Sequence, residues 1–238
     1  MGVILQFPST ATDTQDRVSP VSCLIPKAAT ATTVWSVIPA RRGSKGIPQK
    51  NLCLLAGKTL VERAVETALC VSRPENIIVT TDYEPNEIPA SCRPFWSRRP
   101  PYLATDDTAM VGVLRFEAAR RAWGSGDTVI LIQPSSVHPN RSVITTQSLE
   151  QNYAMTGVKY PTRWHPFYAV EVGYDVLPRN RQGLPDVYRP DGLVYIIRDI
   201  AMLDMYNPYS GPVLPTVGTV TIDTLEDLRE AERVFSGL

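Results

Sequence analysis

Short apolar runs alternate along the chain with longer segments in which apolar residues recur at helical spacing. The runs at 34–38, 76–82 and 128–132 are rich in Val and Ile, and they predict buried strands. Apolar residues at 60, 61, 64, 65, 68 and 69 share one helical face, and further helices are predicted over about 109–123 and 225–235. Asp106, Asp107 and Thr108 are expected to cap the second helix, and Asp223 and Thr224 the last.

The second half of the chain continues this alternation less regularly. Strands are predicted at 154–160, 167–172, 192–197 and 217–222, with loops rich in Pro and Arg among them. Strands separated by helices favour an α/β fold in three layers, α/β/α, around a mostly parallel, Rossmann-like sheet. Residues 154–190 do not fit a simple strand–helix–strand unit, and we expect them to form a small insertion.

Residues 1–32 lack both periodicities and are rich in Thr, Ser, Pro and Ala. We interpret them as a flexible extension that precedes a single domain, 33–238. The four cysteines, at 23, 53, 70 and 92, are widely spaced and form no CxxC pair. This spacing is typical of reduced thiols in a cytoplasmic protein rather than of a zinc site or a disulfide scaffold.

The overall charge is balanced, with 24 Lys and Arg against 24 Asp and Glu. A chain without a net positive field is not expected to bind nucleic acid or an anionic membrane, so any basic function is local. No apolar run approaches the roughly 20 residues that span a bilayer.

The local basic function is concentrated in the loop that follows the first predicted strand, which reads IPARRGSKGIPQKN from residue 38 to residue 51. Gly43 and Gly46 allow the backbone to approach an anion closely, and turned amides form an anion-binding nest. Arg41, Arg42, Lys45 and Lys50 supply positive charge. The pattern predicts a polyphosphate site, although a solvated basic turn is the alternative. It is neither GxxxxGK[ST] nor GxGxxG.

Other polar residues follow the predicted strands at the same end. Asp82, Gln133 and Asp223 each come directly after an apolar run. Ligands of open α/β sheets bind at the carboxyl ends of the strands, so these residues are candidates for the same site as the loop. A turn-capping role is the alternative for Asp82.

The loop closely resembles the nucleotide-binding signature of the acylneuraminate cytidylyltransferases, IPARxGSKG(I/L)PxKN, and the resemblance extends over about 34–238. Arg99-Pro100 and the residues up to Ala109 are similar to the family stretch RPxxLAxDxT, with one extra residue. The resemblance implies a CTP site formed by Ala40, Arg41, Arg42, Gly43, Ser44, Lys45, Asn51, Arg99, Thr108 and Ala109.

Two further stretches resemble the parts of this family that bind the acceptor. Gln133-Pro134-Ser135 is similar to the start of LQPTSPLR, and 181–196 is similar to RQxLPxxFRxNGAIYI, with Asp191 in place of the Asn. The resemblance implies acceptor contacts from Gln133, Ser135, Arg181 and Tyr195. It also implies that the irregular segment contributes to a homodimer.

The largest departure lies near the end of the chain, where most of the family has Asp-Ile-Asp-Thr and this sequence has Thr221-Ile222-Asp223-Thr224. Alternation along a strand is expected to put residues 221 and 223 on one face. The family's pair of Mg²⁺ ligands is therefore reduced to Asp223. Mg²⁺ binds through few carboxylates together with phosphates and waters, so one is expected to suffice.

The resemblance implies an enzyme that transfers CMP from CTP to a small acidic acceptor, such as a sialic-acid-like nonulosonic acid, and releases pyrophosphate. Arg41, Lys45 and Asp223 are the implied catalytic residues. The acceptor remains open between nonulosonic acids, KDO and a phosphonate such as phosphonoformate, and a nucleotide-binding protein without turnover is a further alternative. A sugar pyrophosphorylase that uses UTP or GTP conflicts with the KGIPxKN pattern.

Overall fold

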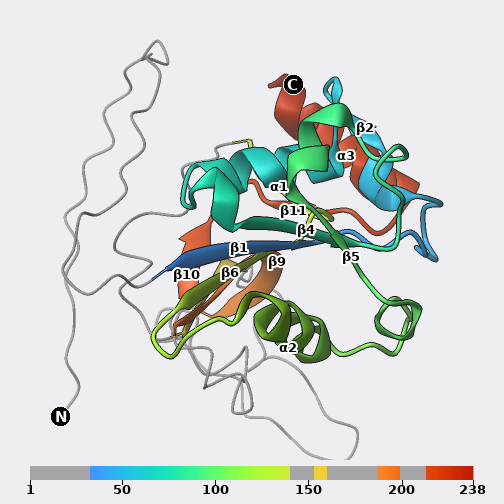
Figure 1. The fold of residues 1–238 in the computed structure, drawn as a ribbon. Coiled ribbons are helices and arrows are strands. Elements are labelled where there is room, and N and C mark those ends of the chain that lie inside the picture. The colour runs from blue at the N-terminus through green and yellow to red at the C-terminus, as the bar shows by residue number, and fades with distance from the viewer. Residues whose placement is uncertain (1–32, 140–152, 160–186, 199–212, 238) are drawn as a thin grey trace, which may run out of the picture.

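The computed structural model describes residues 33–139, 153–159, 187–198 and 213–237 (Figure 1). Within them, seven strands form one sheet in the order β10-β8-β9-β6-β1-β4-β5. The strands are β1 (Val34–Pro39), β4 (Ile77–Thr81), β5 (Trp96–Arg98), β6 (Thr128–Ile132), β8 (Tyr153–Lys159), β9 (Tyr188–Arg198) and β10 (Val213–Thr216).

The pairings within this sheet are mostly parallel, as the sequence predicts. Strands β6, β1, β4 and β5 run parallel to one another, and β10 runs parallel to β8. Strand β9 is antiparallel to both β6 and β8. The carboxyl ends of β1, β4 and β6 therefore meet at one edge, which is where the loop after β1 begins.

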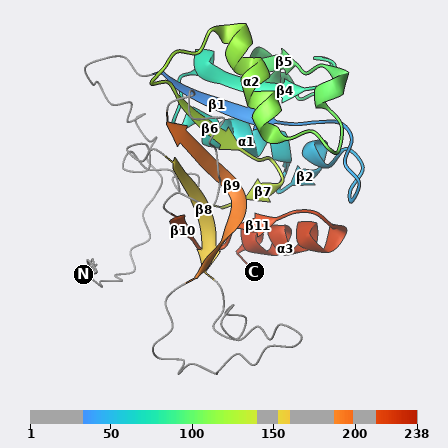
Figure 2. The same cartoon turned by 90° about the horizontal axis from the view of Figure 1, so that it is seen from below.

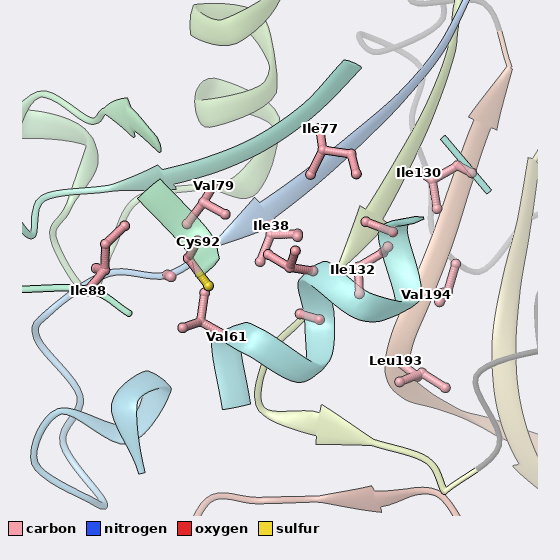
Figure 3. Close-up of a cluster of buried hydrophobic side chains, with 14 of the residues drawn as sticks. Ile38, Val61, Ile77, Val79, Ile88, Cys92, Ile130, Ile132, Leu193 and Val194 are labelled. Carbon is pink, nitrogen blue, oxygen red and sulfur yellow. The ribbon is translucent and has the colours of Figure 1, made fainter. Parts of the chain in front are cut away.

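Helices cover both faces of the sheet, so the predicted three layers are confirmed. Helix α1 (Leu60–Leu69) lies on one face and α2 (Met110–Arg121) on the other, as Figure 1 shows. Alternate residues of each strand serve the two faces because side chains alternate along a strand. Ile38, Val79 and Ile132 pack on the α1 face, part of which Figure 3 draws. The α2 face receives the neighbouring residues Val37, Ile78 and Leu131.

Shorter elements complete the described fold. A two-residue hairpin joins β2 (Leu54–Leu55) to β3 (Lys58–Thr59), and β7 (Ser136–Val137) pairs with β11 (Val220–Thr221). The short 3-10 helices are η1 (Lys50–Leu52), η2 (Pro74–Asn76), η3 (Ala90–Phe95) and η4 (Pro101–Leu103). Helix α3 (Leu225–Ser236) lies beside β11, as Figure 2 shows. None of the helices in these residues has the length and apolar character that a membrane span requires.

The ends of the helices test the capping predictions. Helices α1 and α3 begin with capping boxes, Thr59 with Glu62 and Thr224 with Asp227, so the expected Thr224 cap is confirmed. The prediction for α2 is wrong, because its N-cap is Ala109 and no side chain caps it. Asp106 pairs instead with cations of the loop after β1.

The end of the chain also differs from its prediction. The expected strand at 217–222 is replaced by β10 and the short β11, with a turn between them at Gly218, where φ is +86°. Strands β8 and β9 correspond to the runs predicted at 154–160 and 192–197. The strand predicted at 167–172, most of the expected insertion at 154–190 and residues 1–32 lie outside the described residues.

Candidate functional site

Hydrogen bonds hold the loop that follows β1 against the carboxyl end of β4. The Ala40 amide donates to the Thr80 carbonyl, and the Thr81 hydroxyl donates to the Ala40 carbonyl. The Arg42 amide donates to Asp82 Oδ1 over 2.7 Å, which gives this carboxylate a role in holding the loop. At the far end, the Asn51 side-chain amide donates to the Arg41 carbonyl over 2.8 Å. The backbone that carries the cations is thus fixed at both ends.

The loop forms one wall of a pocket of about 430 Å³ at the carboxyl edge of the sheet. Residues to which the sequence analysis assigns a ligand contact contribute most of its lining, and they come from four separate parts of the chain: Arg41, Ser44, Lys45, Asn51, Arg99, Gln133, Ser135 and Asp223. The remaining lining residues are Pro39, Gly46, Lys50, Met110 and Pro134. The pocket therefore unites five of the ten residues expected to bind nucleotide with two of those expected to bind acceptor.

Arg99 is the buried cation of this pocket, with only 3% of its surface exposed. Its Nη2 donates to the Thr80 carbonyl over 2.9 Å, while its buried Nε has no hydrogen-bond partner in the structure. Burial lowers the pKa of the guanidinium to about 10, against the opposing effect of Asp82 and Glu117. A buried donor without a partner is costly, and the residue that carries it lines the pocket.

Two loop cations share one carboxylate at the outer side of the pocket. Asp106 Oδ1 lies 2.6 Å from Arg41 Nη1, and its Oδ2 lies 2.8 Å from Lys45 Nζ. The hydrogen bond from Lys45 and then that from Arg41 hold the pKa of the Asp106 carboxyl below its usual value. These residues border a second, more open hollow of about 510 Å³, which is also lined by Gly43, Ser44 and 104–107.

Lys50 joins the loop to the segment that carries Asp223. Its Nζ lies 2.7 Å from Asp223 Oδ1 and 2.8 Å from the Ile222 carbonyl oxygen, and its side chain is only 15% exposed. Gly46 makes the second connection, because a Cβ at this position would overlap the main-chain oxygen of Asp223. The loop and Asp223 therefore occupy fixed positions relative to each other.

The donor set around Asp223 fits a Mg²⁺ ion that is held largely by a ligand's phosphates. The Asp223 side chain is 72% exposed and lines the pocket, with one oxygen on Lys50. No group of three His, Cys, Asp or Glu residues suited to a metal occurs among the described residues. Hard oxygen donors suit Mg²⁺, and a single carboxylate leaves most of its coordination to phosphate and water.

Thr221 is absent from the lining of the pocket that Asp223 lines, and it makes a different set of contacts. Strand β11 ends at Thr221, so the period of two does not continue to residue 223. The Thr221 hydroxyl donates to the Asp191 carbonyl over 2.8 Å, and the Ser136 hydroxyl donates to the same oxygen over the same distance. The Asp191 carboxylate is itself buried and accepts from the hydroxyls of Thr156 and Thr216.

Several predicted site residues lie elsewhere. Ala40 is buried in the core, and Arg42 points away from the pocket, pairing with Glu87 and stacking over the Tyr83 ring. The Thr108 hydroxyl contacts that of Thr105, and Tyr195 packs against the hydrophobic cluster on the α2 face. The lining of the main pocket includes none of these residues, nor Gly43 and Ala109. Arg181 lies outside the described residues.

The site also contains residues that the sequence reasoning did not assign to it. Met110 and Pro134 line the pocket, and Asp106 contacts its cations. Lys50 belongs to the cationic loop, but its contact with Asp223, 173 positions away, has no signal in the local pattern. The sequence signal for Asp106 is its negative charge, which predicts a helix cap as readily as an ion pair with the loop.

Comparison with known proteins agrees with this geometry. Residues 36–122 match a family model described as cytidylyltransferase. The chain is 28% identical over 230 residues to the CMP-N,N'-diacetyllegionaminic acid synthase of Legionella pneumophila, covering 85% of this chain and 96% of the relative. It is 28% identical over 179 residues to the N-acylneuraminate cytidylyltransferase of Escherichia coli, covering 69% of this chain but only 42% of that longer relative.

A solved structure supports the fold independently. The structure titled CMP:2-keto-3-deoxy-manno-octonic acid synthetase complexed with CTP superposes with a TM-score of 0.59 at 16% identity. The match covers 87% of this chain and 99% of the solved one. At this identity the likeness concerns the fold, a mostly parallel α/β sheet whose carboxyl edge carries the pocket described above.

Proposed function

The chain belongs to the cytidylyltransferase family, and we propose that it transfers CMP from CTP to an oxygen of an acidic sugar and releases pyrophosphate. The observation that carries this proposal is the pocket at the carboxyl edge of the sheet. There the cationic loop, the buried Arg99 and Asp223 face one space. This arrangement offers separate groups for the phosphates, for the nucleoside and for a cation.

In this proposal the phosphates lie on the loop. Arg41 and Lys45 neutralise their charge, and the Ser44 hydroxyl donates a hydrogen bond to them. The glycine at 46 allows the loop to pack closely on Asp223. Asn51 acts indirectly, by holding the Arg41 carbonyl. The fixed backbone means that little reorganisation is required when the phosphates bind, which favours binding and catalysis.

Arg99 is the group we assign to the nucleoside. Its guanidinium is a donor at the pocket lining, and cytosine presents acceptors at O2 and N3, whereas uracil presents a donor at N3. Discrimination against uracil therefore requires a contact to N3, or to the amino group that only cytosine carries. A mismatched buried donor costs about 1–3 kcal/mol, so we expect CTP to bind about 10-fold or more tightly than UTP.

The reaction is an in-line displacement at the α-phosphorus. The acceptor oxygen forms a bond to this phosphorus and loses its proton, while the bond to the β-phosphate oxygen breaks and pyrophosphate leaves. Arg41 and Lys45 stabilise the charge that develops on the leaving group, and Lys50 holds Asp223 in position. When bound by Asp223 and the phosphates, Mg²⁺ supplies further charge neutralisation at the transferred group.

The acceptor is proposed to lie between Gln133, Ser135 and Asp223, which line the same pocket as the loop. Its acidic group is assigned to Arg181 through the family resemblance. The relatives are named for legionaminic and N-acylneuraminic acids, so a nonulosonic acid is the first candidate. KDO and a phosphonate share the required anionic character and stand as alternative acceptors.

The oligomeric state and the cellular location of the enzyme are part of the proposal. We expect a homodimer in which the segment 154–190 borders the acceptor pocket of the second subunit. We also expect a cytoplasmic enzyme, as the wide spacing of the cysteines in the sequence suggests. Light scattering at micromolar concentration tests the dimer, and a monomeric mass would contradict it.

Pyrophosphate release tests the proposed activity. We expect release that requires both CTP and an acidic sugar, with UTP a poor substitute. Lys45→Ala should lower kcat about 10²- to 10³-fold because the transition state loses a charge-assisted contact. Lys58→Ala is the matched control, since Lys58 lies on β3, pairs with Glu66 and is absent from the pocket lining. CTP binding without release for any acceptor would favour the alternative of a nucleotide-binding protein.

A further inference from the structure

The Asp106 carboxylate occupies the two cations that the proposed function assigns to the phosphates. It bridges Arg41 Nη1 and Lys45 Nζ at 2.6 and 2.8 Å, so each of its oxygens has one cationic partner. This bidentate arrangement is also how a phosphate group engages a pair of cations. An internal anion therefore neutralises the groups proposed to bind phosphate.

The geometry points to a selective role: we propose that Asp106 is a displaceable competitor that makes the pocket respond to the charge of its ligand. A polyphosphate that reaches Arg41 and Lys45 must first separate the carboxylate from both cations. Ligands with several phosphate charges recover that cost through new contacts, whereas a single anion recovers less of it. A nucleoside that does not reach the pair is unaffected. The inference rests on the proposed function in taking CTP as the natural ligand.

The surroundings of Asp106 allow such a displacement. Its side chain is 36% exposed, and those of Arg41 and Lys45 are 31% and 82% exposed, so none of the three is locked in the core. The segment 104–107 borders an open hollow of about 510 Å³ next to the cations. The carboxylate can thus turn into solvent without disturbing the sheet, while Arg41 stays anchored through its carbonyl on Asn51.

Asp107 provides a matched control. It is the next carboxylate on the same segment and lines the same hollow, but it makes no ion pair within the described part of the chain. Asp106→Asn and Asp107→Asn each remove one negative charge from this loop without a large change in volume. Only the first removes the direct competitor.

Titration calorimetry with CTP, cytidine and inorganic tripolyphosphate tests the inference. Asp106→Asn should tighten CTP and tripolyphosphate by about 2- to 30-fold, the range that two exposed ion pairs span. The affinity of Asp106→Asn for cytidine should equal that of the native protein. Asp107→Asn should change the affinities for all three ligands by less than about 2-fold. The gain in Asp106→Asn should shrink between low and high salt, because exposed pairs are screened.

Two results would overturn the inference. Unchanged or weaker tripolyphosphate binding in Asp106→Asn would show that Asp106 organises the loop for its ligand rather than competing with it. Equal tightening by Asp107→Asn would show a diffuse charge effect. A native protein that binds tripolyphosphate but not CTP would contradict the proposed function alone. The ratio of the tripolyphosphate affinities of Asp106→Asn and native protein would still decide the role of Asp106.

Discussion

Replacing Arg99 by Met should stabilise the free protein and weaken its binding of CTP. Arg99 is 3% exposed, and burial lowers its pKa to about 10, which corresponds to about 3 kcal/mol against the charged form. Met fills a similar length without a charge. The Thr80 carbonyl, which accepts from Arg99, also accepts from the Ala40 amide and so keeps a partner.

Removing the buried charge gains this energy, about 3 kcal/mol, and the loss of the hydrogen bond to Thr80 offsets part of the gain. We therefore expect a net stabilisation of about 1–2 kcal/mol, seen as a higher melting temperature without ligand. CTP should bind about 10- to 100-fold more weakly, because a charged donor to the ligand is lost. Arg98→Met is the control, since Arg98 is half exposed and pairs with Glu84 on the surface. A destabilised Arg99→Met protein with native CTP affinity would refute the reasoning, because it would make Arg99 a structural residue.

The remaining predictions concern the loop, a turn, a helix cap and the metal. Gly46→Ala should lower kcat about 10²-fold by moving the loop off Asp223, whereas Gly43→Ala, whose Cβ would meet nothing closer than 3.8 Å, should be tolerated. Ala56→Asn should raise the free energy of unfolding by about 1 kcal/mol, because Ala56 has a φ of +43° before Gly57 in a two-residue hairpin, a position that suits Asn; an unchanged urea midpoint would contradict it. Asp227→Ala should cost about 1 kcal/mol at pH 7 through loss of the α3 cap. Hydrogen bonds from the Asp223 amide and then from Thr224 lower the Asp227 pKa, so this contribution is present above about pH 4 and should decline as pH falls further; a difference that does not shrink on acidification would exclude this cause. Mg²⁺ should bind weakly alone and more tightly with CTP, and tight binding in calorimetry without CTP would show that other residues complete the site.

Local patterns were sufficient to predict the elements that carry the site. The strands at 34–38 and 128–132 and the helices after Thr59 and Thr224 are confirmed because their signals are short-range: an apolar period and a capping box. The loop after β1 was located from its own composition. Three of its four cations line the pocket because a strand delivers the loop to the carboxyl edge of the sheet.

Contacts between residues far apart in the sequence determine the side-chain positions that the local pattern does not reveal. Arg41 and Arg42 are neighbours of the same type, yet one faces the pocket and the other pairs with Glu87. Nothing in the local pattern distinguishes them, because the difference arises where Asp82 holds the Arg42 amide. Asp106 was expected at a helix N-terminus, and the stronger attraction of two loop cations determines its position instead.

The insertion of β9 between β6 and β8 was likewise not predicted. Its apolar run identifies a strand, but strand order and direction depend on pairing across the sheet rather than on periodicity. This position of β9 brings Asp191 beside Ser136 and Thr221, and the hydroxyls of both donate to its carbonyl. The departure at Thr221 therefore leaves a single carboxylate, Asp223, in the pocket lining.

Phosphorus NMR of the native protein with CTP, Mg²⁺ and an acidic sugar tests the transfer of CMP most directly. The expected result is loss of the three CTP resonances and equal gain of pyrophosphate and of one new phosphodiester, for at least one acceptor among N-acylneuraminic acid, a legionaminic acid and KDO. Omitting the acceptor should leave CTP intact. Formation of inorganic phosphate or free CMP in place of the phosphodiester, or an unchanged CTP spectrum with every acceptor, would contradict the assignment.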